Sequence, residues 1–99
     1  METYPNKTQR ELIASLLAVN DEREMARFLR DLLTDAELDE ISKRWLAARM
    51  LNDGESYRTI ISRTGLSSTT VARISKWLQD GTGGYRQALK RLPRASQHR

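Results

Sequence analysis

The sequence predicts an all-α protein built from six helices. Apolar residues recur at intervals of three and four along the chain, and no stretch alternates apolar and polar residues as a half-buried strand does. Short polar residues and glycines, which cap helices, stand between these runs. A length of 99 residues is usual for one domain. We therefore expect a single helical domain over residues 1–93, followed by a disordered basic tail over residues 94–99.

The first half of the chain predicts three of these helices. The first has its apolar stripe within residues 12–17, and the second carries apolar residues at helical spacing over residues 25–33. Thr34 opens the third with a capping box, because Glu37 follows three residues later and can return a hydrogen bond. The third helix, which continues to about residue 51, has more large apolar side chains than a small monomer readily covers.

The second half predicts a helix-turn-helix at about residues 56–78. Ser56 is a good N-cap for a short helix, and Gly65 can adopt the left-handed conformation that ends it. In the following helix, Val71, Ile74 and Leu78 share one face, which we expect to be buried. A short last helix follows a glycine-rich joint. We expect both tryptophans of the chain, Trp45 and Trp77, to be core residues.

The charge of the chain is divided unevenly between its halves. Residues 1–55 hold 8 Lys/Arg and 12 Asp/Glu, a net charge of −4, whereas residues 56–99 hold 9 Lys/Arg and one acid, a net charge of +8. A cationic module beside an acidic one is typical of proteins that bind nucleic acid. The predicted helix-turn-helix lies in the cationic half.

Several classes of function are excluded by composition. The chain has no cysteine and a single histidine, His98, so we expect no metal site and no histidine-based catalysis. No nucleophile–base constellation is visible, and we expect the protein not to be an enzyme. No apolar run is long enough to cross a membrane and the N-terminus lacks the apolar core of a signal peptide, so we expect a cytoplasmic protein without membrane contact.

The outer face of the second helix of the helix-turn-helix is suited to double-stranded DNA. Small polar residues at its start let the backbone approach base edges, and cations further along can reach bases or phosphates. We expect base contacts from one group of residues and phosphate contacts from another. The DNA-binding set consists of Arg58, Ser67, Ser68, Thr69, Thr70 and Arg73 toward bases or the adjoining backbone, and of Arg63, Lys76 and Arg86 toward phosphates.

An alternative interpretation is a helical protein–protein interaction module without sequence-specific DNA binding. Ordinary helix-turn-helix motifs have a small residue four positions before the turn glycine, where this chain has Ile61. The acidic first half also suits a protein partner. Retention on duplex DNA at about physiological salt distinguishes the two hypotheses.

The stretch "LLTDAELDEISKRWLAARMLNDGESYRTIISRTGLSSTTVARISKWL" resembles the tryptophan repressor family, and the "GTGGY" joint after it is similar to the Trp-repressor-like group of the YerC/YecD type. The resemblance covers roughly residues 12–92. It implies an intertwined homodimer whose two recognition helices enter successive major grooves of a palindromic site. It further implies a transcriptional regulator, by analogy a repressor.

The same resemblance raises the question of a tryptophan corepressor. The family's effector clamp falls on Arg44 and Arg73 here, and Thr34 also matches. The family has a glycine after the second arginine, where the indole packs, but this chain has Ile74. We therefore expect no cofactor and no tryptophan binding. A smaller anionic effector at these residues, or an Arg44 that is simply solvated or ion-paired, remain the alternatives.

Overall fold

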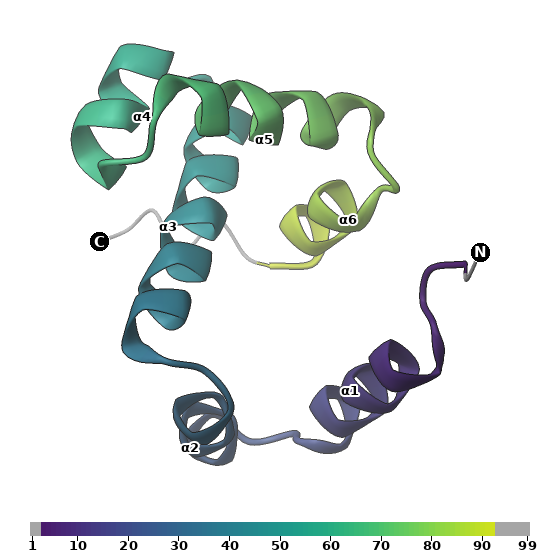
Figure 1. Ribbon diagram of the computed structural model, residues 1–99. Helices are drawn as coiled ribbons and strands as arrows, with labels where there is room; N and C mark the ends of the chain where they lie inside the picture. Colours follow the sequence, from purple (N-terminus) through teal and green to yellow (C-terminus); the bar gives the residue numbers. More distant parts are fainter. Residues whose placement is uncertain (1–2, 93–99) are drawn as a thin grey trace. The chain divides into compact units, whose positions relative to one another are not determined.

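The computed structural model describes residues 3–92, which form six α-helices and no strand. The predicted all-α architecture of six helices is therefore confirmed. The predicted tail, residues 94–99, lies outside the described residues. In chain order the helices are α1 (Lys7–Ala18), α2 (Glu22–Leu32), α3 (Asp35–Asn52), α4 (Tyr57–Thr64), α5 (Ser68–Asp80) and α6 (Gly84–Arg91) (Figure 1).

The contacts within the chain group into two compact units, which meet in sequence between Leu38 and Asp39. The first unit contains α1, α2 and the first turn of α3. The second contains the rest of α3 and the helices α4, α5 and α6. The expectation of one domain over residues 1–93 stays a prediction.

The helices of the first unit begin at side-chain caps. The side chain of Asn6 accepts a hydrogen bond from the Gln9 amide at 2.8 Å, and the Gln9 side chain returns one to the Asn6 amide. The predicted capping box at the start of α3 is confirmed: the Glu37 amide donates to Thr34 Oγ1 at 3.1 Å, and the Thr34 amide donates to Glu37 Oε1 at 2.9 Å. These caps satisfy amides that have no partner inside the helix.

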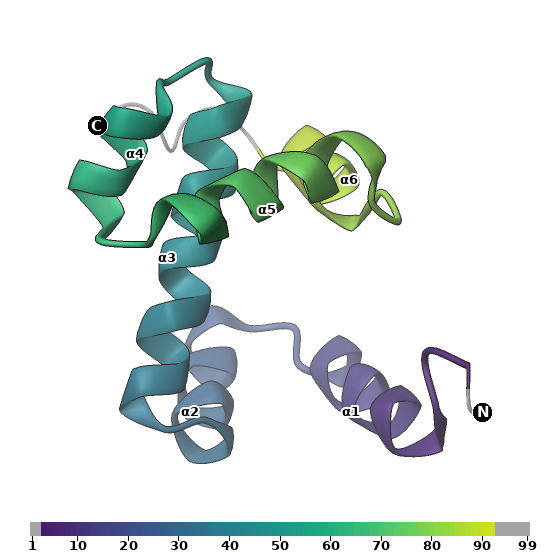
Figure 2. The ribbon, with the colours of Figure 1, turned by 45° about the horizontal axis from the view of Figure 1, so that its top comes forward.

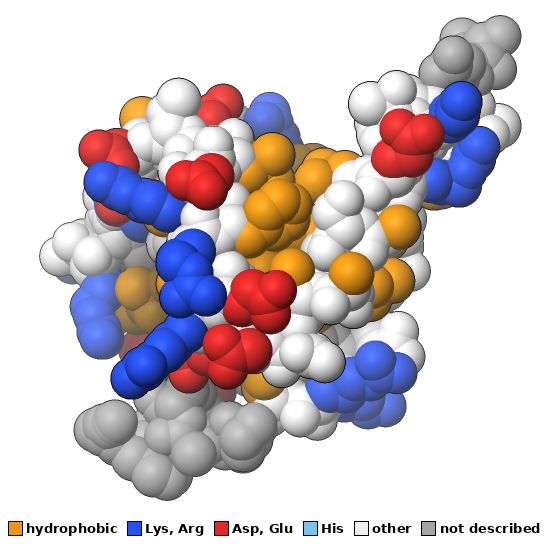
Figure 3. Space-filling model, turned by 90° about the horizontal axis from the view of Figure 1, so that it is seen from below, with side chains coloured by type: hydrophobic (Ala, Val, Ile, Leu, Met, Phe, Trp, Pro, Cys, Tyr) orange, Lys and Arg blue, Asp and Glu red, His pale blue; other side chains and the backbone are white. Residues whose placement is uncertain are grey.

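The apolar side chains of the first unit remain accessible. Neither α1 nor α2 contains a buried residue. Leu17 is 79% exposed and Leu32 is 46% exposed. Figure 3 shows hydrophobic side chains, coloured orange, at the surface of the face that it displays. Leaving so much apolar area in water is unfavourable for a small protein on its own.

The second unit contains the buried core. The C-terminal half of α3 supplies Ala47, Ala48 and Met50, and α4 and α5 pack against each other beside it (Figure 2). The two alanines are fully buried, and their small side chains allow helices to approach closely. The core residues outside α3 are Ile60, Leu66, Val71 and Ile74.

The predicted positions of both tryptophans need correction to different degrees. Trp45 is half-buried and packs against the core, with its ring stacked on that of Tyr85 at a centroid distance of 6.4 Å. Trp77 is 44% exposed, so the prediction that it is a core residue is wrong for the single chain. The buried face of α5 is centred on Val71 and Ile74, and at 100° per residue Trp77 lies at its edge.

Candidate nucleic-acid interface

The turn between α4 and α5 is made by Gly65, as predicted. Its φ of 78° and ψ of 4° are left-handed, a conformation that costs a glycine little and other residues more. The Gly65 amide donates to the Ile61 carbonyl at 2.8 Å, which completes the last turn of α4. Two residues later Ser67 caps α5. The local structure is therefore helix, short turn, helix.

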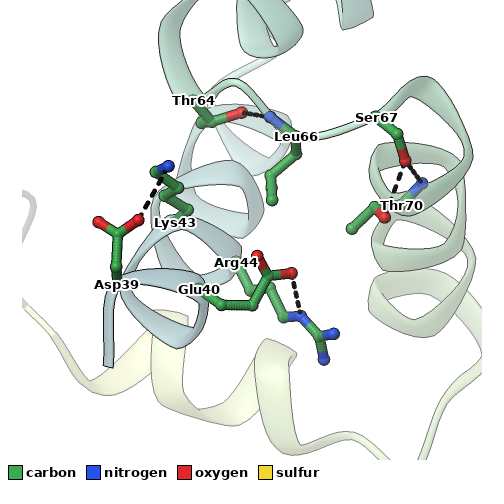
Figure 4. Close-up of polar contacts among 8 residues, drawn as sticks. All are labelled: Asp39, Glu40, Lys43, Arg44, Thr64, Leu66, Ser67 and Thr70. Carbon is green, nitrogen blue, oxygen red and sulfur yellow. Dashed lines mark hydrogen bonds and ion pairs between the residues drawn. The ribbon is translucent and has the colours of Figure 1, made fainter. Parts of the chain in front are cut away.

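Thr64 holds this turn from inside, and sequence reasoning missed it. Its side chain is 4% exposed, donates through Oγ1 to the Ile60 carbonyl at 2.8 Å, and accepts from the Leu66 amide at 3.1 Å (Figure 4). One hydroxyl thus joins the end of α4 to the first residue after the turn. Leu66, also buried, follows it into the core.

Replacing Thr64 with valine is expected to lower the free energy of unfolding by about 2 kcal/mol. Valine has nearly the same shape but leaves the buried Leu66 amide without its partner, which costs about 1–3 kcal/mol. Urea denaturation measures the change. Thr69→Val, at an exposed position of α5, is the matched control and is expected to change the value by no more than about 0.5 kcal/mol. Equal effects of the two changes would contradict this role of Thr64.

The inner face of the motif is buried largely as predicted. Val71 and Ile74 are fully buried, whereas Leu78 is only half-buried. Ile61, the residue that departs from the usual motif, is half-buried and packs against the core. The larger side chain at this position is therefore accommodated by the packing of the second unit.

Two of the predicted DNA-contacting hydroxyls are occupied by a cap. Ser67 Oγ accepts from the Thr70 amide at 3.1 Å and donates to Thr70 Oγ1 at 3.0 Å (Figure 4). The same arrangement begins α4, where Ser56 Oγ accepts from the Thr59 amide and donates to Thr59 Oγ1. The pattern Ser-x-x-Thr therefore orders the N-terminus of each helix of the motif. Ser67 and Thr70 shape the start of α5 before any ligand is present.

The outward face of α5 carries the other predicted residues. Ser68, Thr69, Arg73 and Lys76 are exposed. Thr69, Arg73 and Lys76 follow one another at helical spacing of four and three, so they form one stripe opposite the buried face. Arg58 and Arg63 are exposed on α4. No hydrogen bond or ion pair with residues 3–92 is made by the four cations Arg58, Arg63, Arg73 and Lys76.

Arg86 differs from the other predicted phosphate contacts. Its Nη2 donates to the carbonyl oxygens of Leu78 and Gln79, at 3.0 and 2.9 Å. These carbonyls belong to the last turn of α5. The guanidinium is thus already hydrogen-bonded to the end of α5, although the side chain stays exposed.

Two of the three residues of the predicted effector clamp, Thr34 and Arg44, are engaged in ordinary structural contacts, whereas the third, Arg73, is one of the exposed cations described above. Thr34 forms the capping box of α3 in the first unit. Arg44, in the second unit, lies 3.3 Å from a carboxylate oxygen of Glu40, one helical turn earlier (Figure 4). Both side chains of this pair are about half exposed, so it contributes little to stability. Its geometry is that of the ion-paired arginine considered among the alternatives.

Tyr85 lies near Arg44 and stacks on Trp45. Burial raises the pKa of the Tyr85 phenol, and the positive charge of Arg44 partly opposes this shift. The phenol is therefore neutral at physiological pH. It acts as a packing surface between α6 and α3 and not as an anionic group.

The chain is similar to known proteins over most of its length. The family model for the Trp repressor protein matches residues 7–93. The uncharacterized protein YerC of Bacillus subtilis (strain 168) is 37% identical over 82 residues, which are 83% of this chain and 79% of that protein. A crystal structure of a TrpR-like protein from Eubacterium eligens ATCC 27750 superposes with a TM-score of 0.82 at 29% identity, covering 88% of this chain and 90% of the other. The chain belongs to the Trp repressor protein family and has its all-α fold.

Proposed function

We propose that the protein is a sequence-specific DNA-binding transcriptional regulator that acts as a dimer through its helix-turn-helix. The family is typically composed of DNA-binding regulators without enzymatic activity. The observation that carries the proposal is the outward stripe of α5. Cations that have no partner among residues 3–92 stand there beside small hydroxyl residues, on a helix whose opposite face is buried. Such a helix can enter a major groove without losing internal contacts.

The exposed residues of α4 and α5 make two kinds of contact in this proposal. Base edges are approached by Ser68, Thr69 and Arg73, and Arg58 makes a bidentate contact with a guanine or a phosphate. Arg63 and Lys76 contact phosphates, which fix the register of the protein but carry no sequence information directly. Ser67 and Thr70 contribute through the shape of the helix start, because their hydroxyls are bonded to each other.

The homodimer is proposed from the exposed apolar residues of the first unit. α1 and α2 are short helices without any buried residue, and such helices are marginal in water unless something covers them. A second copy of the chain covers them in the family's intertwined arrangement. Sedimentation equilibrium is expected to give twice the 11.4 kDa chain mass, and a monomer at micromolar concentration contradicts the dimer.

Selection of bound duplexes from a random pool tests the proposed function. A recovered palindrome, with half-sites about one helical turn of DNA apart, is expected for two symmetric recognition helices. Equal affinity for random and selected duplexes would remove the claim of sequence specificity. Running the selection with and without tryptophan also tests the expectation that tryptophan does not act as a corepressor. That the regulator represses transcription is proposed only by analogy with the family.

Lys76→Ala is expected to weaken binding to selected and random duplexes alike. A phosphate contact releases counterions when it forms, so its loss from both chains of the dimer makes the slope of log affinity against log salt shallower by about two and leaves the specificity ratio unchanged. Fluorescence anisotropy at several salt concentrations measures both quantities. Ser62→Ala, at an exposed position of α4 without a charge, is the control and keeps the wild-type slope. A specificity ratio that falls for Lys76→Ala means that Lys76 reads bases.

The exposed apolar surface also supports the second candidate, a helical protein–protein interaction module. None of the helices among residues 3–92 is long and apolar enough to cross a bilayer. The two functions separate on immobilised duplex DNA at about physiological salt. Early elution, together with unimpaired folding, favours the interaction module.

A further inference from the structure

The joint between α5 and α6 contains two glycines in constrained positions, Gly81 and Gly83, and the two helices contact each other. Gly81 ends α5, and a Cβ there would lie 2.5 Å from the Trp77 carbonyl oxygen, so no other residue fits without a shift of the backbone. Gly83 has a φ of 97°, in the left-handed region, and it begins α6 without any side-chain cap. Glycine permits this path but does not hold it, because glycine has the most conformational freedom of any residue.

Two contacts hold the start of α6 in place. The ring of Tyr85 stacks on Trp45 of α3, and the next residue, Arg86, donates from Nη2 to the carbonyls of Leu78 and Gln79 at the end of α5. Adjacent residues of α6 thus bind two different helices. They connect the C-terminal end of the recognition helix, through α6, to α3.

The electrostatics of α5 explain why a cation is needed at this point. The last turn of α5 has no basic residue of its own, and the helix ends at Asp80. A carboxylate is unfavourable at the negative end of a helix dipole, where the last carbonyls also lack partners within the helix. The guanidinium of Arg86 supplies the missing positive charge and satisfies two of these carbonyls.

We infer that Arg86 is a positioning residue for DNA binding: it locks α6 across the C-terminal end of the recognition helix, and it does so instead of contacting a phosphate. The inference rests on the proposed DNA-binding function for its effect on affinity, but the lock itself is a property of the free protein. With the lock in place, the end of α5 is braced against α3 through Arg86, Tyr85 and Trp45.

The test compares Arg86→Gln with Arg91→Gln, which removes the same charge from an exposed position of the same helix. The lock is tested in the free protein by the rate of amide hydrogen exchange at two hydrogen bonds on either side of it. These are the bond from the Gly81 amide to the Trp77 carbonyl and the bond from the Gln87 amide to the Gly83 carbonyl. Exchange at both amides is expected to be about tenfold faster in Arg86→Gln, because two charge-assisted hydrogen bonds are lost, and unchanged in Arg91→Gln. Affinity for the selected duplex is expected to fall several-fold, with the wild-type dependence on salt.

Two results would overturn the inference. Unchanged exchange at Gly81 and Gln87 in Arg86→Gln means that no lock exists. A salt slope that becomes shallower by about two, one phosphate contact for each chain of the dimer, means that Arg86 contacts a phosphate. If Arg86→Gln does not fold, the inference is tested on the wild-type protein by NMR of its guanidinium groups. The signals of Arg86 are expected to stay unchanged when duplex is added. A shift of these signals as large as that of Arg73 overturns the inference. A wild-type protein that fails to bind any duplex refutes the proposed function, while the exchange data still decide on the lock.

Discussion

Replacing Ile74 with alanine is expected to lower the free energy of unfolding by about 3 kcal/mol. Ile74 is fully buried in the core of the second unit, and truncating such a side chain removes apolar burial and leaves a cavity, at a cost of about 2–5 kcal/mol. Because small domains are stable by only about 5–15 kcal/mol, this single change takes a large share of the total. Thermal and urea unfolding, followed by circular dichroism, measure it.

Lys76→Ala is the control for Ile74→Ala, since it shortens an exposed side chain two residues further along the same helix. It is expected to change stability by no more than about 0.5 kcal/mol. If Ile74→Ala is equally mild, α5 is not held by its buried face, and the proposed geometry of the recognition helix fails with it. The two variants therefore separate the role of the buried face from that of the outer face.

The burial of Ile74 also bears on the question of an effector. Ile74 is buried in the core beside Arg73, and Arg44 is paired with Glu40. Tryptophan is therefore expected to leave both the melting temperature and the DNA affinity unchanged. A rise in melting temperature with tryptophan concentration would contradict this expectation, because a ligand that binds the folded state stabilises it.

The features that were predictable from sequence depend on neighbours in the chain. The capping box at Thr34, the cap at Ser56 and the turn at Gly65 each follow from residues three or fewer positions apart, and all three occur in the structure. The burial of Val71 and Ile74 follows from helical periodicity. Local chemistry was sufficient for these elements because each forms within a single helix or turn.

The features that were missed depend on contacts between elements. Thr64 reads as an ordinary polar residue until the turn at Gly65 brings the Leu66 amide back to its hydroxyl. In the sequence Arg86 has the features of a free surface cation. In the structure the glycine joint places α6 beside the last carbonyls of α5, where Arg86 binds them. Trp77 lies at the edge of the buried face, where periodicity alone does not decide exposure.

Arg73→Ala is expected to reduce affinity for the selected duplex by about 10- to 100-fold for each half-site and to relax specificity at one base pair in each half-site. Arg73 is exposed in the middle of the outward stripe of α5, one turn beyond Thr69. It makes no hydrogen bond or ion pair with residues 3–92 of the protein, so its guanidinium is available to a ligand. A bidentate contact of arginine with guanine contributes about 1–3 kcal/mol of discrimination, which corresponds to this range.

Arg73→Lys separates a base contact from a phosphate contact at the same position. Lysine keeps the charge but lacks the planar fork that matches the two acceptors of guanine. Specific affinity is therefore expected to fall nearly as far as in Arg73→Ala, while affinity for random duplexes and the salt slope stay close to wild type. Competition binding with selected and random duplexes gives the specificity ratio, the affinity for the selected duplex divided by that for random duplexes, of each variant. If Arg73→Lys retains the wild-type specificity ratio, Arg73 serves the phosphate backbone, and base reading must come from Arg58 and the hydroxyl residues at the start of α5.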